Sequence, residues 1–415
     1  MTSASLVRRD TCRICDGRTL DRVLSFGCTP LANAFLRREE LGGSEDTFPL
    51  ELHLCADCGH LQLLDVVDPE RLFRDYLYVS STSPAFVEHF RRYADDVLAR
   101  SAPPPGSLVV EIGSNDGVLL RHFQARGMKV LGVDPALAIA RAATASGIET
   151  LPRFFDAAVA EEILGRHGPA AVVAANNVLA HADDLHGILR GVERLLGPQG
   201  VLVFEVSYLL DVYEKTLFDM TYHEHLSYHS VAPLVRLLEA HGLELVEALR
   251  VPTHGGSLRA LAQRRGGPLA RGASVGDLIA RERAAGLDRA ATFVGFGERI
   301  ADLKRELRSL LLGLRAEGRR IAGYGAPAKL TTLMHVFEIG PEIVEFVVDD
   351  SPLKQHRYTP GHHIPVLPVS ELYRAKPDFV LILAWNFAES IIANHRAFQE
   401  QGGRFIVPLP RLEVR

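Results

Sequence analysis

The alternation of short aliphatic runs with helical patterns constrains the fold of this chain more than any other feature. In the first series, between Ser107 and Ser207, the aliphatic runs are SLVVEIG, KVLGVD, AAVVAANN and VLVFEVS. Apolar runs of this length, separated by helical segments, are typical of a mostly parallel sheet with crossover helices. A second series begins at Arg319 and contains RRIAGYGAPAKL, VEFVVDD, DFVLILAW and RFIVPLP. We therefore predict an α/β protein in which the alternation of strands and helices occurs in two separate regions.

Changes of composition mark the boundaries between domains. A chain of 415 residues is too long for one hydrophobic core and is expected to form two or three domains. The polar, proline-rich segment SAPPPGS (101–107) separates a cysteine-bearing region from the first strand-and-helix series. A charged stretch rich in Leu and Ala, at 277–314, is predicted to be one long helix that links two lobes. The expected domains are residues 1–80, 81–255 and 256–415.

Composition and charge narrow the class of protein. Hydrophobic residues make up 47% and charged residues 23% of the chain, which is ordinary for a globular enzyme. The net charge of −5 gives no overall attraction to nucleic acid or to anionic lipid. No apolar run approaches the roughly 18 residues of a membrane-spanning helix, and the start, MTSASLVRRD, lacks the apolar segment of a signal peptide. We expect a cytoplasmic protein that binds neither nucleic acid nor a membrane.

Four of the five cysteines form two C-x-x-C pairs, Cys12 with Cys15 and Cys55 with Cys58. Each pair sits where a tight turn can direct two thiolates at one point, and four such ligands make a closed tetrahedral zinc site. A catalytic zinc is disfavoured because four thiolates leave no open coordination position, and a redox role is disfavoured outside a thioredoxin-like context. We predict a structural zinc ion. Cys28 has no partner in this pattern and is expected to be a small buried residue.

The segment SLVVEIGSNDGVLLRHF (107–123) is predicted to form a buried strand, a glycine-bearing loop and the start of a helix. Its pattern, Glu111-x-Gly113-x-x-x-Gly117, departs from the dinucleotide fingerprint and resembles motif I of class I S-adenosylmethionine-dependent methyltransferases. Gly113 would let the backbone approach a cofactor, and Gly117 would let the helix pack close to the strand. The next predicted strand ends in Asp134, whose carboxylate can accept both ribose hydroxyls.

Other polar residues are expected at the same edge of the sheet. Asn176 and Asn177 end the AAVVAANN strand, at the edge where open α/β sheets bind their ligands. We expect Asn176 to contact S-adenosylmethionine, together with Asn115 and Asp116 of the glycine loop. Asn177 is expected to contact the second substrate.

Three histidines and a glutamate gather in the segment DMTYHEHLSYHS (219–230). An H-E-x-x-H zinc motif needs a glutamate directly after the first histidine, and the pair His225 and His229 lacks it. His223 and His225 could share one strand face, but no third and fourth ligand is evident. The segment follows the VLVFEVS strand and is therefore expected beside the cofactor. A histidine there can abstract a proton near neutral pH, and the adjacent carboxylate of Glu224 can orient it and raise its basicity.

Taken together, these motifs resemble those of the sugar C-methyltransferases of antibiotic deoxysugar pathways, in particular the nucleotide-sugar C-3 methyltransferase of the tetronitrose pathway. The resemblance covers essentially the whole chain and rests on the cysteine pairs, VVEIGSNDG, TYHEHLSY, THGGSLR, GYGAPAK and VVDDSPLKQHRYTPG. It implies a zinc domain, a central class I Rossmann-like methyltransferase domain and a C-terminal Rossmann-like domain that serves as a sugar-nucleotide platform. It also implies S-adenosylmethionine as methyl donor and a dTDP-linked 4-keto-6-deoxysugar as substrate, methylated at C-3.

The resemblance implies a catalytic role for the histidine segment. Carbon methylation needs a carbanion equivalent, which forms when a base removes the acidic C-3 proton beside the 4-keto group. By resemblance His225 is that base, with Glu224 beside it and Tyr222 as a donor near the keto oxygen. His181, in the segment NNVLAHADDL, could also reach the sugar and is the alternative base.

The resemblance also suggests residues for the sugar nucleotide. Tyr76 could close the pocket from the zinc-domain side, and His254 of THGGSLR could touch the nucleotide or the sugar. The GYGAPAK loop follows a predicted strand and opens a helix, so its backbone amides could cradle a diphosphate. Lys329 would add a positive charge there.

Two other classes of protein remain open at this point. An O- or N-methyltransferase acting on a small molecule or a sugar would share the cofactor motif, but it needs less of the carbon-acid apparatus that the histidine segment offers. A zinc-ribbon module that binds nucleic acid would share the cysteine pattern. The net charge of −5 and the lack of a basic face disfavour it.

Overall fold

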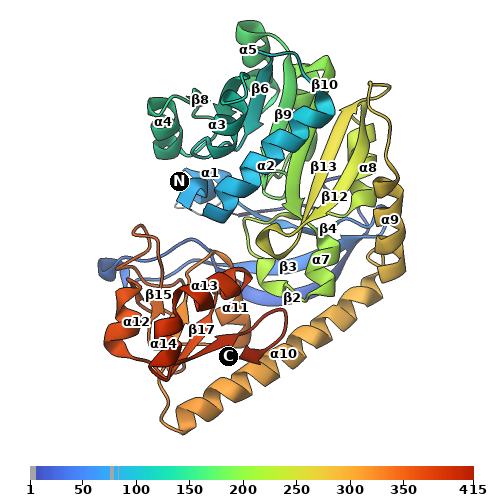
Figure 1. The fold of residues 1–415 in the computed structure, drawn as a ribbon. Helices are drawn as coiled ribbons and strands as arrows, with labels where there is room; N and C mark the ends of the chain where they lie inside the picture. The colour runs from blue at the N-terminus through green and yellow to red at the C-terminus, as the bar shows by residue number, and fades with distance from the viewer. Residues whose placement is uncertain (1–5, 75–78, 83) are drawn as a thin grey trace.

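The computed structural model describes residues 6–74, 79–82 and 84–415, so Tyr76 lies outside the described residues. Figure 1 shows three units: a small N-terminal sheet in blue, a larger sheet domain from teal to yellow, and a C-terminal domain from orange to red. The blue sheet lies between the other two units. The predicted α/β class, with a small cysteine-bearing domain ahead of two α/β domains, is confirmed.

The N-terminal unit is an antiparallel sheet, and one of its strands belongs to the histidine segment, residues 219–230. Its strands, in spatial order, are β11 (Ser227–Tyr228), β4 (Leu61–Leu63), β3 (Thr47–Cys55) and β2 (Leu20–Pro30). A two-stranded ribbon joins β1 (Leu6–Arg8) to β5 (Asp65–Val67), and the short helix α1 (Pro69–Phe73) follows. The pairing of β11 with β4 fixes the histidine segment to the cysteine-bearing sheet, although the two strands lie far apart in sequence.

The central domain is a seven-stranded sheet in the order β12-β13-β10-β9-β6-β7-β8. Its strands are β6 (Leu108–Ile112), β7 (Lys129–Val133), β8 (Thr150–Leu151), β9 (Ala170–Asn176), β10 (Leu196–Ser207), β12 (Leu243–Val251) and β13 (Ser257–Arg264). Strands β6 to β10 are parallel, and β13 runs antiparallel to both of its neighbours. The β6 residues are all buried, as a parallel sheet covered on both faces requires.

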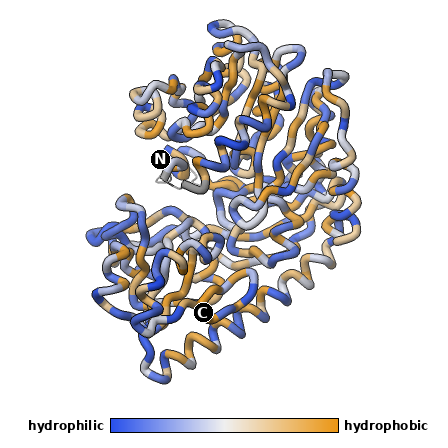
Figure 2. Tube along the Cα trace, viewed as in Figure 1, coloured by the Kyte–Doolittle hydropathy of each residue, from blue (hydrophilic) through white to orange (hydrophobic). Residues whose placement is uncertain are grey.

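Helices cover both faces of this sheet. They are α2 (Pro84–Ser101), α3 (Val118–Gln124), α4 (Leu137–Ala145), α5 (Ala157–His167), α6 (Leu185–Leu195) and α8 (Val231–Glu239), while α7 (Leu209–Glu214) directly follows β10 and lies near β3. Figure 2 shows hydrophobic residues along the sheet strands and hydrophilic ones on the outer turns of the helices. None of the described helices combines the length and apolarity that crossing a bilayer requires.

Two sequence-based boundaries need correction. The central domain extends past the expected end at residue 255, because β13 hydrogen-bonds to β10 and β12 and completes the sheet. The expected single helix at 277–314 is two helices, α9 (Ala273–Ala285) and α10 (Ala290–Ala316). Gly286 ends α9 in the left-handed conformation, with φ of 70°, and an α-helix cannot continue through that geometry.

The C-terminal domain has a six-stranded sheet in the order β16-β15-β14-β17-β18-β19. Its elements are β14 (Ile321–Tyr324), α11 (Lys329–Phe337), β15 (Val347–Val348), β16 (Val366–Leu367), α12 (Ser370–Ala375), β17 (Phe379–Ile382), α13 (Ala388–Asn394), α14 (Arg396–Glu400), β18 (Arg404–Val407) and β19 (Glu413–Val414). Numbered within this domain, the order is 3-2-1-4-5-6, the strand order of the Rossmann fold. Helix α10 packs against β2 and α11 and so spans two units.

Candidate active site

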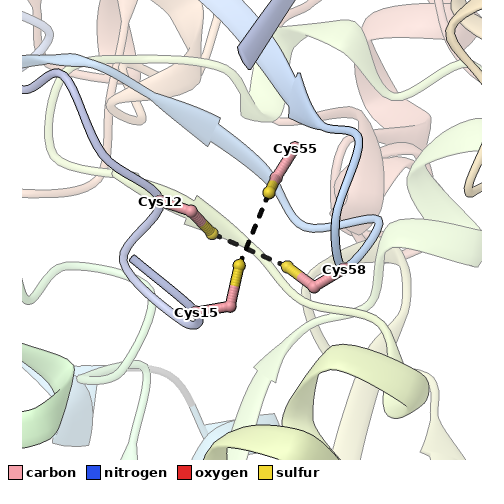
Figure 3. Close-up of side chains that lie close together, drawn as sticks. All are labelled: Cys12, Cys15, Cys55 and Cys58. Atoms are coloured by element: carbon pink, nitrogen blue, oxygen red, sulfur yellow. Dashed lines mark hydrogen bonds between the residues drawn. The ribbon is translucent and has the colours of Figure 1, made fainter. Parts of the chain in front are cut away.

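The four paired cysteines converge on one point. Among the described residues they form the one group of His, Cys, Asp or Glu side chains placed to hold a metal, with all ligand atoms within 4.8 Å of one another. The Sγ atoms of Cys12 and Cys58 are 3.6 Å apart, as are those of Cys15 and Cys55 (Figure 3). Zn–S bonds of about 2.3 Å in a tetrahedron place the sulfurs about 3.8 Å apart, so the cluster fits zinc.

Backbone hydrogen bonds form the turn that holds the second pair, Cys55 and Cys58. Cys55 N–H donates to the His60 carbonyl and closes a turn in which Gly59 has φ of 75°. This left-handed geometry favours glycine, and the Gly59 N–H donates to the Cys55 carbonyl within the same turn. Cys28 is exposed on β2, at the open edge of the sheet, so the expectation that it would be buried is wrong.

The glycine loop after β6 has the geometry that the sequence predicted. Gly113 has φ of 67°, and a Cβ there would come within 2.5 Å of Cγ2 of Val178. Gly117 has φ of 76° and is the N-cap of α3, where a Cβ would come within 2.9 Å of Ile148. Both positions therefore require glycine, for conformation and for space.

Asp134, at the end of β7, faces this loop. Its Oδ2 accepts a hydrogen bond of 2.8 Å from the Asn115 backbone N–H, and its Oδ1 accepts one of 2.9 Å from Ala136. Burial raises the pKa of the Asp134 carboxyl, while these two backbone donors act in the opposite direction. Each oxygen keeps a lone pair, so the carboxylate can hold the loop and still accept ribose hydroxyls.

Two acidic groups of the loop region have unpaired oxygens. Oε2 of Glu111 and Oδ1 of Asp116 are buried and have no hydrogen-bond partner among the described residues. Burial raises the pKa of Glu111 well above its usual value, and the neighbouring side chain of Asn176 acts against that shift. Unpaired buried oxygens are costly unless a ligand or water satisfies them. They fit S-adenosylmethionine, which brings an ammonium, a sulfonium and ribose hydroxyls.

A buried ion network that the sequence did not predict lies beside the ends of β9 and β10. Glu205 accepts hydrogen bonds from Nε2 of His89 at 2.9 Å and from Arg259, whose Nη2 lies 2.6 Å away. Burial raises the pKa of Glu205, but the bonds from His89 and Arg259 outweigh it and leave the pKa below its usual value. The backbone N–H of Asn177, at φ of 56°, donates to the Glu205 carbonyl at 2.7 Å.

His225 and Tyr222 form the centre of the histidine segment. Nδ1 of His225 lies 2.7 Å from the Met220 carbonyl oxygen, which can only accept, so Nδ1 carries the proton. Nε2 therefore holds the lone pair and accepts the Tyr222 hydroxyl at 2.7 Å. Burial, together with repulsion from His181, lowers the pKa of His225 well below its ordinary value. The ring is neutral and keeps one basic nitrogen.

Two more predicted histidines adjoin this pair. The His181 ring meets the His225 ring edge-on, with centroids 4.9 Å apart and an interplanar angle of 87°. Burial and repulsion from His254 lower the pKa of His181 to about 4. Burial and the nearby charge of Lys329 lower the pKa of His254 to about 4. His254 has φ of 55° in the short turn Thr253–Gly255, where its ring lies 4.8 Å from that of Phe86.

The other members of the segment face the zinc domain. Oε1 of Glu224 accepts a 2.6 Å hydrogen bond from Asn33, and the Met220 carbonyl, which the sequence did not indicate, contacts Nδ1 of His225. Nε2 of His223 is 3.1 Å from the Phe48 carbonyl. His229 is fully buried, with its ring centroid 5.5 Å from that of His60. A backbone carbonyl carries no sequence signal, which is why its role was missed.

Lys329 joins the C-terminal domain to the histidine segment. Its Nζ lies 3.6 Å from the centroid of the Trp385 ring and 2.7 Å from Oδ1 of Asn386. Burial lowers the pKa of Lys329 to about 8, and the negative charge of Asp219 opposes this. Trp385 Nε1 in turn donates to Oδ2 of Asp219 at 2.6 Å. Lys329 is thus a buried lysine that lies close to Asp219 of the histidine segment.

A cavity of about 610 Å³ lies elsewhere, between β2, α10 and the C-terminal domain. Its lining includes Lys304 and Arg308, and both basic side chains form ion pairs with Glu338. It contains none of the residues predicted for catalysis or cofactor binding, so we do not place the active site there.

The fold and the site define a class I methyltransferase that carries a four-thiolate zinc site. Three family models match: "Putative zinc binding domain" over residues 12–73, "Methyltransferase domain" over 86–248 and "C-methyltransferase C-terminal domain" over 252–410. The chain is 39% identical to "C-methyltransferase NovU" of Streptomyces niveus over 405 residues, which cover 98% of this chain and 96% of that protein. The chain therefore belongs to the C-methyltransferase family. Its expected cofactors, S-adenosylmethionine and zinc, agree with these matches.

More distant relatives match less than half of the chain. A "Ubiquinone biosynthesis O-methyltransferase" of Burkholderia thailandensis is 28% identical over 162 residues, which cover 36% of this chain and 70% of that protein. The solved structure of magnesium protoporphyrin IX methyltransferase from Synechocystis PCC 6803 with bound SAH aligns with a TM-score of 0.34 at 19% identity. That alignment covers 43% of this chain and 84% of the solved chain.

Proposed function

We propose that the protein methylates C-3 of a dTDP-linked 4-keto-6-deoxysugar, with S-adenosylmethionine as methyl donor. The observation that carries the proposal is the pairing of neutral, buried His225 with the hydroxyl of Tyr222. A carbon acid needs a base for its proton and a donor for the enolate oxygen, and this pair offers one of each. Membership of the C-methyltransferase family supports carbon, rather than oxygen or nitrogen, as the methylated atom.

For the methyl donor we propose the pocket around the glycine loop. Asp134 would accept the ribose hydroxyls, and the unpaired oxygens of Glu111 and Asp116 would face the polar groups of the cofactor. Gly113 allows the loop to take its left-handed turn against Val178, and this turn would hold the loop in place beside the cofactor. When bound, S-adenosylmethionine supplies an electrophilic methyl group.

His225 would act as the base through Nε2. Its Nδ1–H bond to the Met220 carbonyl fixes the ring and keeps the lone pair on Nε2. The same carbonyl would stabilise the imidazolium once Nε2 has taken the C-3 proton. The low pKa of His225 reflects burial in the free protein, and the negative charges of a sugar diphosphate nearby would raise it toward the working range.

Tyr222 would act on the substrate ketone. Its hydroxyl donates to Nε2 of His225 in the free protein, and turning it to the keto oxygen would expose Nε2 to the C-3 proton. The phenol then donates to the enolate oxygen as negative charge develops there. C-3 of the enolate would then take the methyl group that S-adenosylmethionine supplies: a C–C bond would form, the S–CH₃ bond would break with S-adenosylhomocysteine as the leaving group, and the proton on His225 would be released to water.

Four residues are proposed to contact the sugar nucleotide. His181 and His254 lie close enough to His225 to lower its pKa and would contact the sugar, while Asn177 directly follows β9 and would contact it from there. The loop before α11, with Lys329, would bind the diphosphate through backbone N–H groups and positive charge. We propose the cytoplasm as the compartment, because reduced thiols are kept there for the zinc site.

Two measurements test the proposal. Incubation with ¹³C-methyl-labelled S-adenosylmethionine and a dTDP-4-keto-6-deoxysugar should give a product in which NMR places the label on a carbon. Incubation of the sugar nucleotide in deuterated water without cofactor should exchange the C-3 proton. A label on oxygen or nitrogen, with no C-3 exchange, would sink the proposal and favour a heteroatom methyltransferase.

A further inference from the structure

Arg13 lies between two of the zinc-ligating cysteines, yet its side chain is fully buried and points away from the metal site. The residue is 1% exposed, and its guanidinium extends toward β4 and the histidine segment. A buried guanidinium is costly unless its donors find acceptors, so its partners show what the side chain holds in place.

Those partners belong to separate segments of the active site. Nη1 of Arg13 donates to the carbonyl of Leu63 and to Oε1 of Gln62, both on β4. The same nitrogen lies 3.4 Å from the carbonyl oxygen of Leu226, the residue directly after His225. Nε donates to Oδ1 of Asp183 at 3.0 Å, two residues after His181. One side chain thus touches the segments of both candidate bases.

Backbone hydrogen bonds connect the same segments. Leu63 N–H donates to the Leu226 carbonyl at 2.9 Å, and Ser227 N–H donates to the Ala180 carbonyl at 3.1 Å. The His181 segment, β11 and β4 therefore form one hydrogen-bonded layer, and Arg13 spans it from the zinc side. Asp183 also forms an ion pair with Arg9, but no described contact joins Arg9 to Leu226.

From this geometry we propose that Arg13 is a positioning residue that fixes the His181 and His225 segments relative to each other and couples them to the zinc site. The proposal rests on the proposed function, because it assumes that one of these histidines takes the substrate proton. Arg13 touches no cofactor residue of the glycine loop. Its loss should therefore reduce turnover and leave cofactor binding intact, and loss of zinc should act on turnover through the same contacts.

The test replaces Arg13 in the full, zinc-loaded protein. Arg13→Gln should lower kcat for methylation by about 10- to 100-fold, the usual effect of a small misplacement of catalytic groups. The affinity for S-adenosylmethionine by calorimetry and the zinc content should stay at wild-type values. Arg13→Lys should recover part of kcat, because an ammonium can replace some but not all of the donors. The matched control is Arg18→Gln, a charge loss a few residues after the turn at an exposed residue, whose one ion pair among the described residues is with Asp10.

A second readout needs no substrate. Hydrogen–deuterium exchange followed by mass spectrometry should show faster amide exchange in residues 222–230 of Arg13→Gln, and unchanged exchange in β6 and β9. If Arg13→Gln does not fold, Asp183→Ala, which removes a partly exposed partner of the same contact, should lower kcat with zinc retained. Wild-type kcat in either variant, or loss of zinc from Arg13→Gln, would overturn the proposal. Failure of wild-type protein to exchange the C-3 proton would instead overturn the proposed function and leave the exchange result for residues 222–230 standing.

Discussion

The phenolic oxygen of Tyr222 lies 2.7 Å from Nε2 of His225. Because Nδ1 of the same ring is held by the Met220 carbonyl, this contact occupies the one lone pair that His225 can use as a base. The proposed base and the proposed donor are therefore in contact in the free protein, and under our proposal the substrate separates them. This relationship makes different predictions for the two side chains.

Tyr222→Phe removes the donor but leaves Nε2 of His225 free. Methylation should fall by about 10²- to 10³-fold, the usual effect of losing one donor to a developing oxyanion, while C-3 exchange remains measurable. NMR of the sugar nucleotide in deuterated water gives the exchange rate. If exchange vanished in Tyr222→Phe but persisted without His225, the phenol itself would be the base.

The zinc site predicts how the five thiols react. Under native conditions one thiol per chain, that of exposed Cys28, should react rapidly with a thiol reagent, and the other four only after denaturation with a chelator. Metal analysis should find one zinc per chain. Cys28→Ser is the control and should abolish the rapid phase without loss of zinc. Five equally reactive thiols, or zinc-free protein that keeps its fold, would contradict the assignment.

Asp134→Asn tests the cofactor site. The amide oxygen can replace only part of the carboxylate's acceptor capacity and carries no charge, so the Kd for S-adenosylmethionine should rise by about 10- to 100-fold. Calorimetry gives the Kd, and a melting temperature close to that of the wild type shows that the loop survives. Glu161→Gln, on the outer surface of α5, is the matched control and should leave the Kd unchanged. Equal affinity in Asp134→Asn would place the ribose elsewhere.

Buried histidines predict a loss of stability in acid. Burial lowers the pKa of His229 from 6.5 to about 4. Above pH 6.5 the side chain is neutral in both the folded and the unfolded chain, so the free energy of unfolding is at its full value there. As the pH falls below 6.5 the unfolded chain takes up a proton that the folded chain refuses, and stability is lost progressively down to pH 4. The loss amounts to about 3 kcal/mol for this group. Urea unfolding of His229→Asn between pH 7 and pH 5.5 should show a shallower decline than the wild type. Parallel declines would mean that His229 does not contribute.

Local patterns in the sequence were enough to predict part of this structure. The cysteine pairs, the glycine loop and Asp134 are each defined by residues a few positions apart or by the end of one strand, and the structure places them as expected. The expected end of the central domain at residue 255 falls inside the hairpin of β12 and β13, and the pairing of β13 with β10, which is distant in sequence, completes the sheet. Pairing between distant strands leaves no local pattern in the sequence.

The candidate site shows the same limit. The sequence drew attention to His225 and Tyr222 because they lie close together in an unusual polar run. It could not indicate that a backbone carbonyl, that of Met220, orients the imidazole. Nor could it indicate that Arg13, inside a zinc-binding turn, reaches the segment after His225, since that contact exists only once β11 pairs with β4.

The most direct test of the account is the rate of C-3 proton exchange in His225→Asn. Asparagine keeps a similar size and can still hydrogen-bond, but it cannot accept the proton, so methylation should fall by about 10²- to 10⁴-fold. Exchange at C-3 of the dTDP-4-keto-6-deoxysugar should fall with it, because both reactions begin with the same proton transfer. Affinities for cofactor and sugar should change little, since the lost interaction belongs to the transition state. Exchange at the wild-type rate in His225→Asn would contradict the account and make His181 the next base to test.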